Sequence, residues 1–172
     1  NNSADDLGGA VFSEGVNFAV EKCDFTNNTA INGGAIYSMA YPNLIDTCNF
    51  TDNTADETAG AVYLGSDNNT VKNSIFTNNS ANSGGAIYSD VNDELYVLNS
   101  KFNYNSAQEY GGAIMADDYA NIVNSTFNSN NATTGGAVYS DSEADFSNST
   151  FSGVYSFLTF KTRGNVKIKN IW

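Results

Sequence analysis

Acidic side chains recur in short groups along the middle of the chain, and they are the first candidates for chemistry. Carboxylates grouped in this way bind Ca²⁺, and a facing pair of them can hydrolyse a glycosidic bond. We weigh a Ca²⁺ site at Asp90, Asp93, Asp117 and Asp118 and a catalytic pair against a solvated acidic edge, and we favour the solvated edge. The whole group comprises Asp67, Asp90, Asp93, Glu94, Asp117, Asp118, Asp141, Glu143 and Asp145.

Groups that serve as a catalytic base are scarce in this sequence. It contains no His, and its single Arg is Arg163 near the C-terminus, while Lys22, Lys72 and Lys101 lie far apart. A lyase needs such a base beside carboxylates that bind Ca²⁺, and a hydrolase needs paired carboxylates in a groove. We therefore expect a protein that is not an enzyme and that needs no cofactor.

A set of aromatic residues forms a second candidate site. Each follows a Gly-Gly-Ala-aliphatic sequence, or Ala-Gly-Ala-aliphatic in the case of Tyr63, so alternation along a strand places it on the face opposite the aliphatic residue. Exposed Tyr rings of this kind stack on sugars or anchor a protein partner, whereas rings stacked between neighbouring strands simply stabilise a sheet. Both interpretations stay open, and our hypothesis is that this strip contacts a ligand. The strip comprises Phe12, Tyr37, Tyr63, Tyr88 and Tyr139, with Met115 in the fifth place.

Two cysteines, Cys23 and Cys48, occupy equivalent places in successive repeats. Stacked parallel strands bring such residues within the Cα distance that disulfides use, although parallel side chains strain the bridge. Buried free thiols are the favoured interpretation, since a thiol is a good small core residue. Two cysteines alone build neither a zinc site nor a redox motif.

The charge balance excludes whole classes of partner. The 172 residues carry 7 basic and 19 acidic side chains, which gives a net charge of −12. A nucleic-acid-binding protein needs a basic stripe, which is missing here, and an anionic membrane surface repels such a chain. No apolar run is long enough to span a membrane, so we expect no membrane insertion by this segment.

Two sequence boxes repeat six times and define the architecture. The first reads Gly-Gly-Ala-(Ile/Val)-aromatic, as in Gly84-Gly85-Ala86-Ile87-Tyr88. The second ends in a Phe followed three residues later by Asn in five of six copies. Its copies end at Phe25, Phe50, Phe76, Phe102, Phe127 and Phe151, at intervals of 24 to 26 residues. Self-similarity at this period indicates a solenoid.

Short β-prone stretches broken by Gly, Asn, Asp and Ser identify the kind of solenoid. The sequence predicts an all-β fold, a right-handed parallel β-helix of six to seven coils, with three strands and three bends per coil. The inward columns are expected at the Phe positions, at Val11 and its equivalents and at Val20 and its equivalents. Cysteine or serine two residues before each Phe points the same way. The stacked Asn28, Asn53, Asn79, Asn105 and Asn130 are expected to hydrogen-bond along the rod.

The two ends of the chain depart from the regular array. Residues 1–152 are expected to form the repeat array, starting inside a coil as a piece of a longer protein does. Residues 153–172 lose the pattern and collect four of the seven basic residues, which predicts an atypical last coil or a C-terminal cap. Asn-x-Ser/Thr acceptors for glycosylation also recur, although an Asn-rich repeat produces them by composition. They lie at Asn1, Asn27, Asn49, Asn68, Asn78, Asn124, Asn131 and Asn148.

The pairing of the Gly-Gly-Ala-(Ile/Val) box with Phe-x-x-Asn resembles the repeats of chlamydial polymorphic outer-membrane proteins. The fuller form, as in Asn73–Ala81 followed by Gly84–Ser89, is similar to adhesin-like proteins of methanogenic archaea. The resemblance covers residues 1 to about 152. It implies a large modular surface protein whose motif residues are scaffold positions, so no binding site is carried over.

These observations lead to one functional expectation and two alternatives. We expect an extracellular, cell-surface adhesin segment, monomeric as a domain, that attaches to a surface glycan or protein of another cell. The alternatives are a polysaccharide-active β-helix enzyme of the lyase or hydrolase class and a purely structural spacer stalk.

Overall fold

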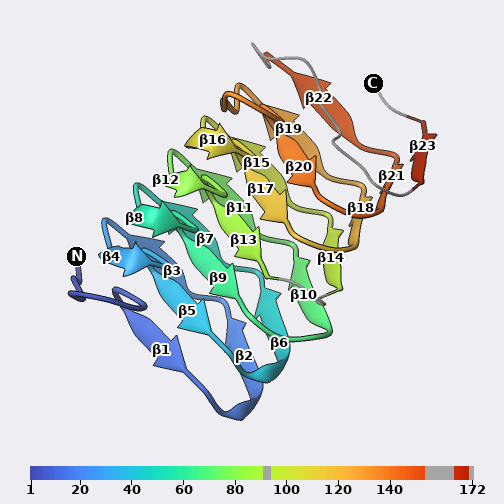
Figure 1. Ribbon diagram of the computed structural model, residues 1–172. Coiled ribbons are helices and arrows are strands. Elements are labelled where there is room, and N and C mark those ends of the chain that lie inside the picture. Colours follow the sequence, from blue (N-terminus) through green and yellow to red (C-terminus); the bar gives the residue numbers. More distant parts are fainter. Residues whose placement is uncertain (91–93, 154–164, 171–172) are drawn as a thin grey trace.

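The computed structural model describes residues 1–90, 94–153 and 165–170. Every regular element in these residues is a β-strand. The strands pair in parallel with their equivalents one repeat away, so that successive coils stack into a rod, with the first and last described strands at opposite ends of the stack (Figure 1). The predicted parallel β-helix of six to seven coils is confirmed.

The rod has four sheets, which follow one another around each coil. The first sheet contains β1 (Val11–Ser13), β5 (Ile36–Ser38), β9 (Val62–Leu64), β13 (Ile87–Ser89), β17 (Ile114–Ala116) and β20 (Val138–Ser140). The second contains β2 (Val16–Glu21), β6 (Tyr41–Asp46), β10 (Asn69–Lys72), β14 (Leu95–Leu98), β18 (Ala120–Val123), β21 (Ala144–Ser147) and β23 (Val166–Lys169).

The third and fourth sheets complete the coil. The third contains β3 (Asp24–Thr26), β7 (Asn49–Thr51), β11 (Ile75–Thr77), β15 (Lys101–Asn103), β19 (Thr126–Asn128) and β22 (Thr150–Ser152). The fourth contains β4 (Thr29–Asn32), β8 (Thr54–Thr58), β12 (Ser80–Ser83) and β16 (Ser106–Tyr110).

The expectation of three strands per coil is wrong, because one left-handed residue divides the second sheet from the third. In the middle coils that residue is Asn73, with φ 53°, and Asn99, with φ 50°. Asn tolerates this conformation better than other residues with a side chain. A turn of a single residue bends the chain sharply without a glycine, so the sequence carries no strong signal for it.

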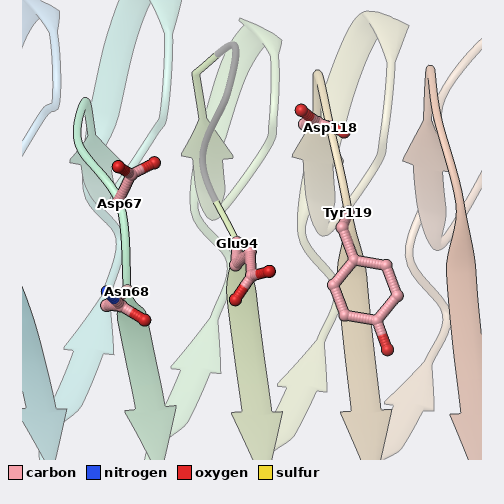
Figure 2. Close-up of a pocket in the computed structure, with 5 residues that line it drawn as sticks. All are labelled: Asp67, Asn68, Glu94, Asp118 and Tyr119. Carbon is pink, nitrogen blue, oxygen red and sulfur yellow. The ribbon is translucent and has the colours of Figure 1, made fainter.

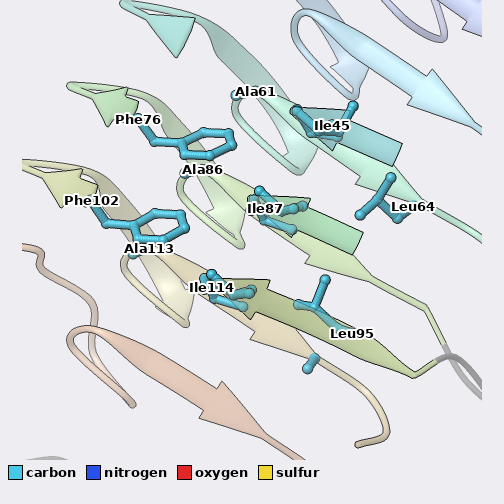
Figure 3. Packing of buried hydrophobic residues seen from close by; sticks show 14 of the residues in the cluster. Ile45, Ala61, Leu64, Phe76, Ala86, Ile87, Leu95, Phe102, Ala113 and Ile114 are labelled. Atoms are coloured by element: carbon cyan, nitrogen blue, oxygen red, sulfur yellow. The ribbon is translucent and has the colours of Figure 1, made fainter. Parts of the chain in front are cut away.

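The core is built from ladders of like residues (Figure 3). The ring centroids of Phe50, Phe76, Phe102 and Phe127 lie 4.8–4.9 Å from one coil to the next, with the rings nearly parallel. These four side chains are fully buried, and each contributes about 1.5–3 kcal/mol through its burial. The predicted inward columns are therefore confirmed, and the aliphatic ladders of the first two sheets pack against the Phe column.

A buried asparagine ladder runs beside the Phe column. In the middle of the rod, the side-chain amide of Asn79 donates to Asn105 Oδ1 and to the Phe50 carbonyl, both at 3.0 Å. The same geometry joins Asn28, Asn53, Asn105 and Asn130 to their neighbours. These side chains satisfy backbone groups at the bend, where no strand partner is available. The expected structural role of the asparagines is confirmed.

The paired glycines have two separate roles. Gly84 adopts a φ of +66°, which L residues with a side chain rarely adopt, whereas Gly85 lies against the backbone of the next coil. A Cβ atom on Gly85 would lie 2.7 Å from the carbonyl carbon and oxygen of Ser106. The first glycine turns the chain, and the second allows adjacent coils to approach.

Strand β23 continues the second sheet beyond the last regular repeat. It pairs with β21, and Ile168 stands opposite Phe146 in the aliphatic column. Within the predicted segment 153–172, residues 154–164 and 171–172 lie outside the described residues. These include Phe157, Phe160, Lys161 and Arg163.

Candidate functional site

The predicted aromatic strip lies on the outer face of the first sheet, but much of it is covered. Phe12 is 48% exposed, whereas Tyr63 is 9% and Tyr139 3% exposed. Tyr37 and Tyr88 are half-buried. The expectation of an exposed strip is therefore wrong for Tyr63 and Tyr139. Alternation fixes only the direction of a side chain, and neighbouring groups determine whether it meets solvent.

Stacking and neighbouring side chains account for this burial. The ring centroids of Tyr37 and Tyr63 are 4.3 Å apart, and those of Tyr63 and Tyr88 are 5.4 Å apart. The Tyr110 ring, from the end of β16, lies 4.9 Å from Tyr139. Met39 lies over Gly65, beside the edge of the Tyr63 ring. Stacking between coils thus covers the Tyr63 ring on both faces, and Tyr110 covers part of the Tyr139 ring.

Tyrosine hydroxyls on this face donate to carboxylates of the next coil. Tyr63 Oη donates to Asp90 Oδ2 at 2.5 Å, and Tyr88 Oη donates to Asp117 Oδ2 at 2.6 Å. Burial, followed by the adjoining carboxylate, raises the pKa of both phenols above the ordinary value near 10. In the same way burial and Asp141 raise the pKa of Tyr139 to about 12. The phenols therefore stay protonated and act as donors.

The described residues give the Ca²⁺ hypothesis no support. Asp90 and Asp117 accept hydrogen bonds from the stacked tyrosines, and Asp93 lies outside the described residues. Within residues 1–90, 94–153 and 165–170, no three His, Cys, Asp or Glu side chains converge as a set of metal ligands. A Ca²⁺ site needs at least six oxygen ligands around one point.

The surroundings of Asp117 disfavour the charged form of its carboxyl. Burial raises the pKa of this carboxyl, and the charges of Asp90 and Asp141 raise it further, against the opposing effect of the Tyr88 hydroxyl. A carboxyl with a higher pKa in the folded chain binds protons more tightly there, so the folded chain loses stability as pH rises from about 4. The ionised group therefore costs stability at neutral pH.

We expect Asp117→Asn to unfold at a higher urea concentration than the wild type at pH 7. The amide oxygen still accepts from Tyr88 Oη, while the buried charge and its repulsion disappear. The difference should shrink towards pH 3, where Asp117 is protonated. Urea unfolding at several pH values measures this, with Asp56→Asn, an exposed carboxylate on β8, as the matched control. A wild type more stable than the variant at pH 7 would contradict the account.

An open groove lies beside the strip, where the chain passes from the first sheet to the second (Figure 2). It consists of two adjoining hollows of about 400 Å³ and 350 Å³, which share Glu94, Asp118 and Tyr119. We call this the acidic groove. Its lining residues are Asp67, Asn68, Glu94, Asp118, Tyr119, Ser142 and Glu143.

Successive coils supply the groove, because each coil places its connecting segment above the next. Figure 2 shows Asp67 and Asn68 on one coil, Glu94 on the following coil, and Asp118 and Tyr119 on the one after. Four carboxylates line the groove, and none of its described lining residues is basic. The carboxylates are exposed or half-buried. Such a lining accepts hydrogen bonds from hydroxyl and ammonium groups.

Tyrosines give the groove aromatic surfaces as well as polar ones. The Tyr119 ring is half-buried and packs edge to face against Tyr96, with centroids 6.4 Å apart. Tyr119 Oη donates to Asp145 at 3.2 Å, and Tyr96 Oη donates to Glu94 at 2.9 Å. Burial, followed by Asp145, raises the pKa of Tyr119. These hydrogen bonds fix the rings beside the carboxylates.

Sequence reasoning placed Asp67, Glu94, Asp118 and Glu143 on one acidic edge but missed Tyr96, Tyr119 and Asn68. These residues do not recur from coil to coil, so the repeat pattern gives no sign of them. The available signal was adjacency, since Tyr119 directly follows Asp118 and Asn68 follows Asp67.

The acceptor asparagines for glycosylation all lie on the surface. The eight asparagines of Asn-x-Ser/Thr triplets are exposed, whereas the five ladder asparagines are buried. No described residue belongs to a helix able to cross a bilayer.

A family comparison agrees with this architecture. Residues 1–127 match the family described as the right handed beta helix region. The chain therefore belongs to that family, which defines the fold and leaves the activity open. Searches among curated proteins and among solved structures give no significant match.

Proposed function

We propose that this chain is a non-enzymatic segment of a cell-surface adhesin that attaches to glycans through the acidic groove. The observation that supports this most strongly is the Tyr119 ring in a groove lined by carboxylates from four successive coils. Aromatic rings stack on the apolar faces of sugars. Carboxylate and amide oxygens accept hydrogen bonds from sugar hydroxyls. The groove offers both kinds of contact.

The charge of the groove restricts the class of glycan. The groove carboxylates repel uronates and sulfated sugars, and the net charge of −12 adds to that repulsion. These carboxylates belong to Asp67, Glu94, Asp118 and Glu143. A neutral glycan avoids this cost, and a glycan with free amines gains charge-assisted hydrogen bonds. Because the carboxylates follow successive coils spaced by about 4.8 Å, an extended glycan fits best along the rod axis.

The enzyme alternative is less well supported by the same groove. A glycosidase needs one carboxyl with a raised pKa to act as general acid. Burial raises the pKa of the Asp117 carboxyl, but this group accepts a hydrogen bond from Tyr88 and does not line the groove. A structural spacer remains the other alternative, and a groove with fixed aromatic rings favours binding over spacing.

The proposed location is the cell surface. The eight exposed acceptor asparagines and the strongly acidic, hydrated surface agree with display outside the cell. In that setting the stacked coils would act as a stiff rod that holds the groove away from its attachment point.

Replacement of Tyr119 tests this proposal. We expect Tyr119→Ala to weaken glycan binding about tenfold, the value of one lost aromatic stacking contact. Tyr119→Phe keeps the ring and should bind within about threefold of the wild type. Biolayer interferometry on immobilised chitosan and mannan oligosaccharides measures the affinities.

Tyr104→Ala is the matched control, because Tyr104 is 58% exposed but lies at the turn after β15, away from the groove. Circular dichroism verifies that each variant keeps its β-fold. Equal binding by wild type and Tyr119→Ala would refute the groove as the site, and equal losses in Tyr119→Ala and Tyr104→Ala would do the same.

A further inference from the structure

The two cysteines are direct neighbours across the first two coils. Cys23 precedes β3 and Cys48 precedes β7, and these strands pair with Asp24 opposite Asn49. The Asn49 amide donates to the Cys23 carbonyl at 2.9 Å, which holds the two coils together at this point. Adjacent coils lie about 4.8 Å apart, which falls inside the Cα range of disulfide bonds.

The two sulfur atoms occupy the same kind of position. Cys23 Sγ lies 3.2 Å from the Glu21 carbonyl oxygen, and Cys48 Sγ lies 3.2 Å from the equivalent oxygen of Asp46. Cys48 Sγ also lies 3.5 Å from the Val20 oxygen, which belongs to the coil of Cys23. The Cys48 sulfur therefore already reaches towards the neighbouring coil.

The two thiols differ in their access to solvent. Cys23 is half-buried, whereas Cys48 is 1% exposed. Burial is the main cause that raises the pKa of the Cys48 thiol. The thiolate is the nucleophile in thiol–disulfide exchange, and exchange requires access. A soluble oxidant therefore meets Cys23 first.

In the other four coils, serine occupies the position equivalent to Cys23 and Cys48. These serines show what packing alone requires at that position. Ser74, Ser100, Ser125 and Ser149 are buried at the equivalent positions. Each of their hydroxyls accepts from a backbone amide of the preceding coil, as Ser74 Oγ does from the Cys48 amide at 3.1 Å. A small polar side chain thus satisfies the site, and packing gives no reason for two adjacent cysteines.

We propose that Cys23 and Cys48 form a disulfide bond when the folded chain meets a small-molecule disulfide. The Cys23 thiolate attacks one sulfur of the oxidant and releases the other as a thiolate, which leaves a mixed disulfide on Cys23. Cys48 then gives its proton to solvent and attacks the Cys23 sulfur, and the second oxidant thiolate leaves. Two protein thiols are oxidised, and one small disulfide is reduced to two thiols. The bond joins the first two coils.

Oxidised glutathione tests the proposal on the purified chain. After incubation, denaturation and alkylation, we expect a wild-type monomer that has lost two hydrogens and carries no alkyl group. The bond closes a loop of some 26 residues, and the strain of a bridge between parallel side chains offsets part of that gain. The thermal midpoint should therefore rise by roughly 5–10 °C, and reduction should reverse the rise.

Single serine variants separate the role of Cys23, the thiol that attacks the oxidant, from the role of Cys48, the thiol that resolves the mixed disulfide. Cys48→Ser should retain one glutathione on Cys23, because the resolving thiol is missing, and Cys23→Ser should react far more slowly. Serine already fills this column elsewhere, so both variants should fold. A folded wild-type chain that is alkylated at both cysteines after the treatment would overturn the proposal, as would a bond formed only between chains.

Discussion

Gly85→Ala should abolish cooperative folding or lower the stability by more than about 4 kcal/mol, the range of severe core defects. The new Cβ would meet the Gly112 carbonyl oxygen well inside van der Waals contact, and it would lie 2.7 Å from two backbone atoms of Ser106. Backbone atoms of a stacked coil cannot rotate away as a side chain does. Relief therefore requires two coils to separate, which breaks parallel hydrogen bonds on both sides of the bend.

Gly15→Ala is the matched control. Its new Cβ would have only the Ser13 hydroxyl nearby, at 4.0 Å, so we expect a change within about 0.5 kcal/mol, as for other surface substitutions. Thermal and urea unfolding followed by circular dichroism compare the two variants. Similar stability of Gly85→Ala and Gly15→Ala would show that the coils do not approach as closely as the account requires.

Asn79→Asp should cost roughly 3–5 kcal/mol, the range for an uncompensated charge in a buried network. Asn79 is fully buried, and its amide group donates to the Phe50 carbonyl and to Asn105 Oδ1. A carboxylate has no hydrogen to donate, so oxygen would face oxygen at both contacts. Its other two bonds, accepted from Asn53, survive the change.

The effect of this substitution should depend on pH. Burial raises the pKa of the new carboxyl above that of the unfolded chain, so the lost stability should partly return as pH falls below about 4. Asn99→Asp is the control, because Asn99 is exposed. Its side chain also accepts from one asparagine, Asn124, and donates to another, Asn73, at 3.4 Å, but water can replace the lost donation and solvate the new charge. Urea unfolding at pH 7 and pH 3.5 separates the variants. Equal midpoints for the two at pH 7 would contradict a buried ladder.

The ladders could be predicted because each column repeats one residue type at one place in the coil. The Phe and Asn columns needed only the period and the alternation of strand side chains, and the structure confirms both. Burial of Tyr63 and Tyr139 could not be predicted in this way. It depends on Met39 and Tyr110, which approach from segments whose sequence differs between coils.

The groove, too, could be predicted only where its residues recur from coil to coil. Its carboxylates belong to a recurring acidic edge, which the sequence revealed, while Tyr119 and Asn68 occur once each at their positions. Their proximity follows from the stacking of connecting segments that vary in length and composition. The one-residue turn at Asn73 was missed for a different reason, since Asn is common throughout the repeat and its left-handed φ leaves no distinct pattern.

The measurement that tests the central claim most directly is a glycan array probed with the unmodified chain at low and physiological salt. The account predicts binding to neutral and amine-bearing glycans and none to uronate-rich ones. Added salt should weaken only the binding of the amine-bearing glycans, because it screens their attraction to the groove carboxylates. Preferential binding to uronate-rich glycans, or no binding to any glycan by the folded chain, would contradict the account.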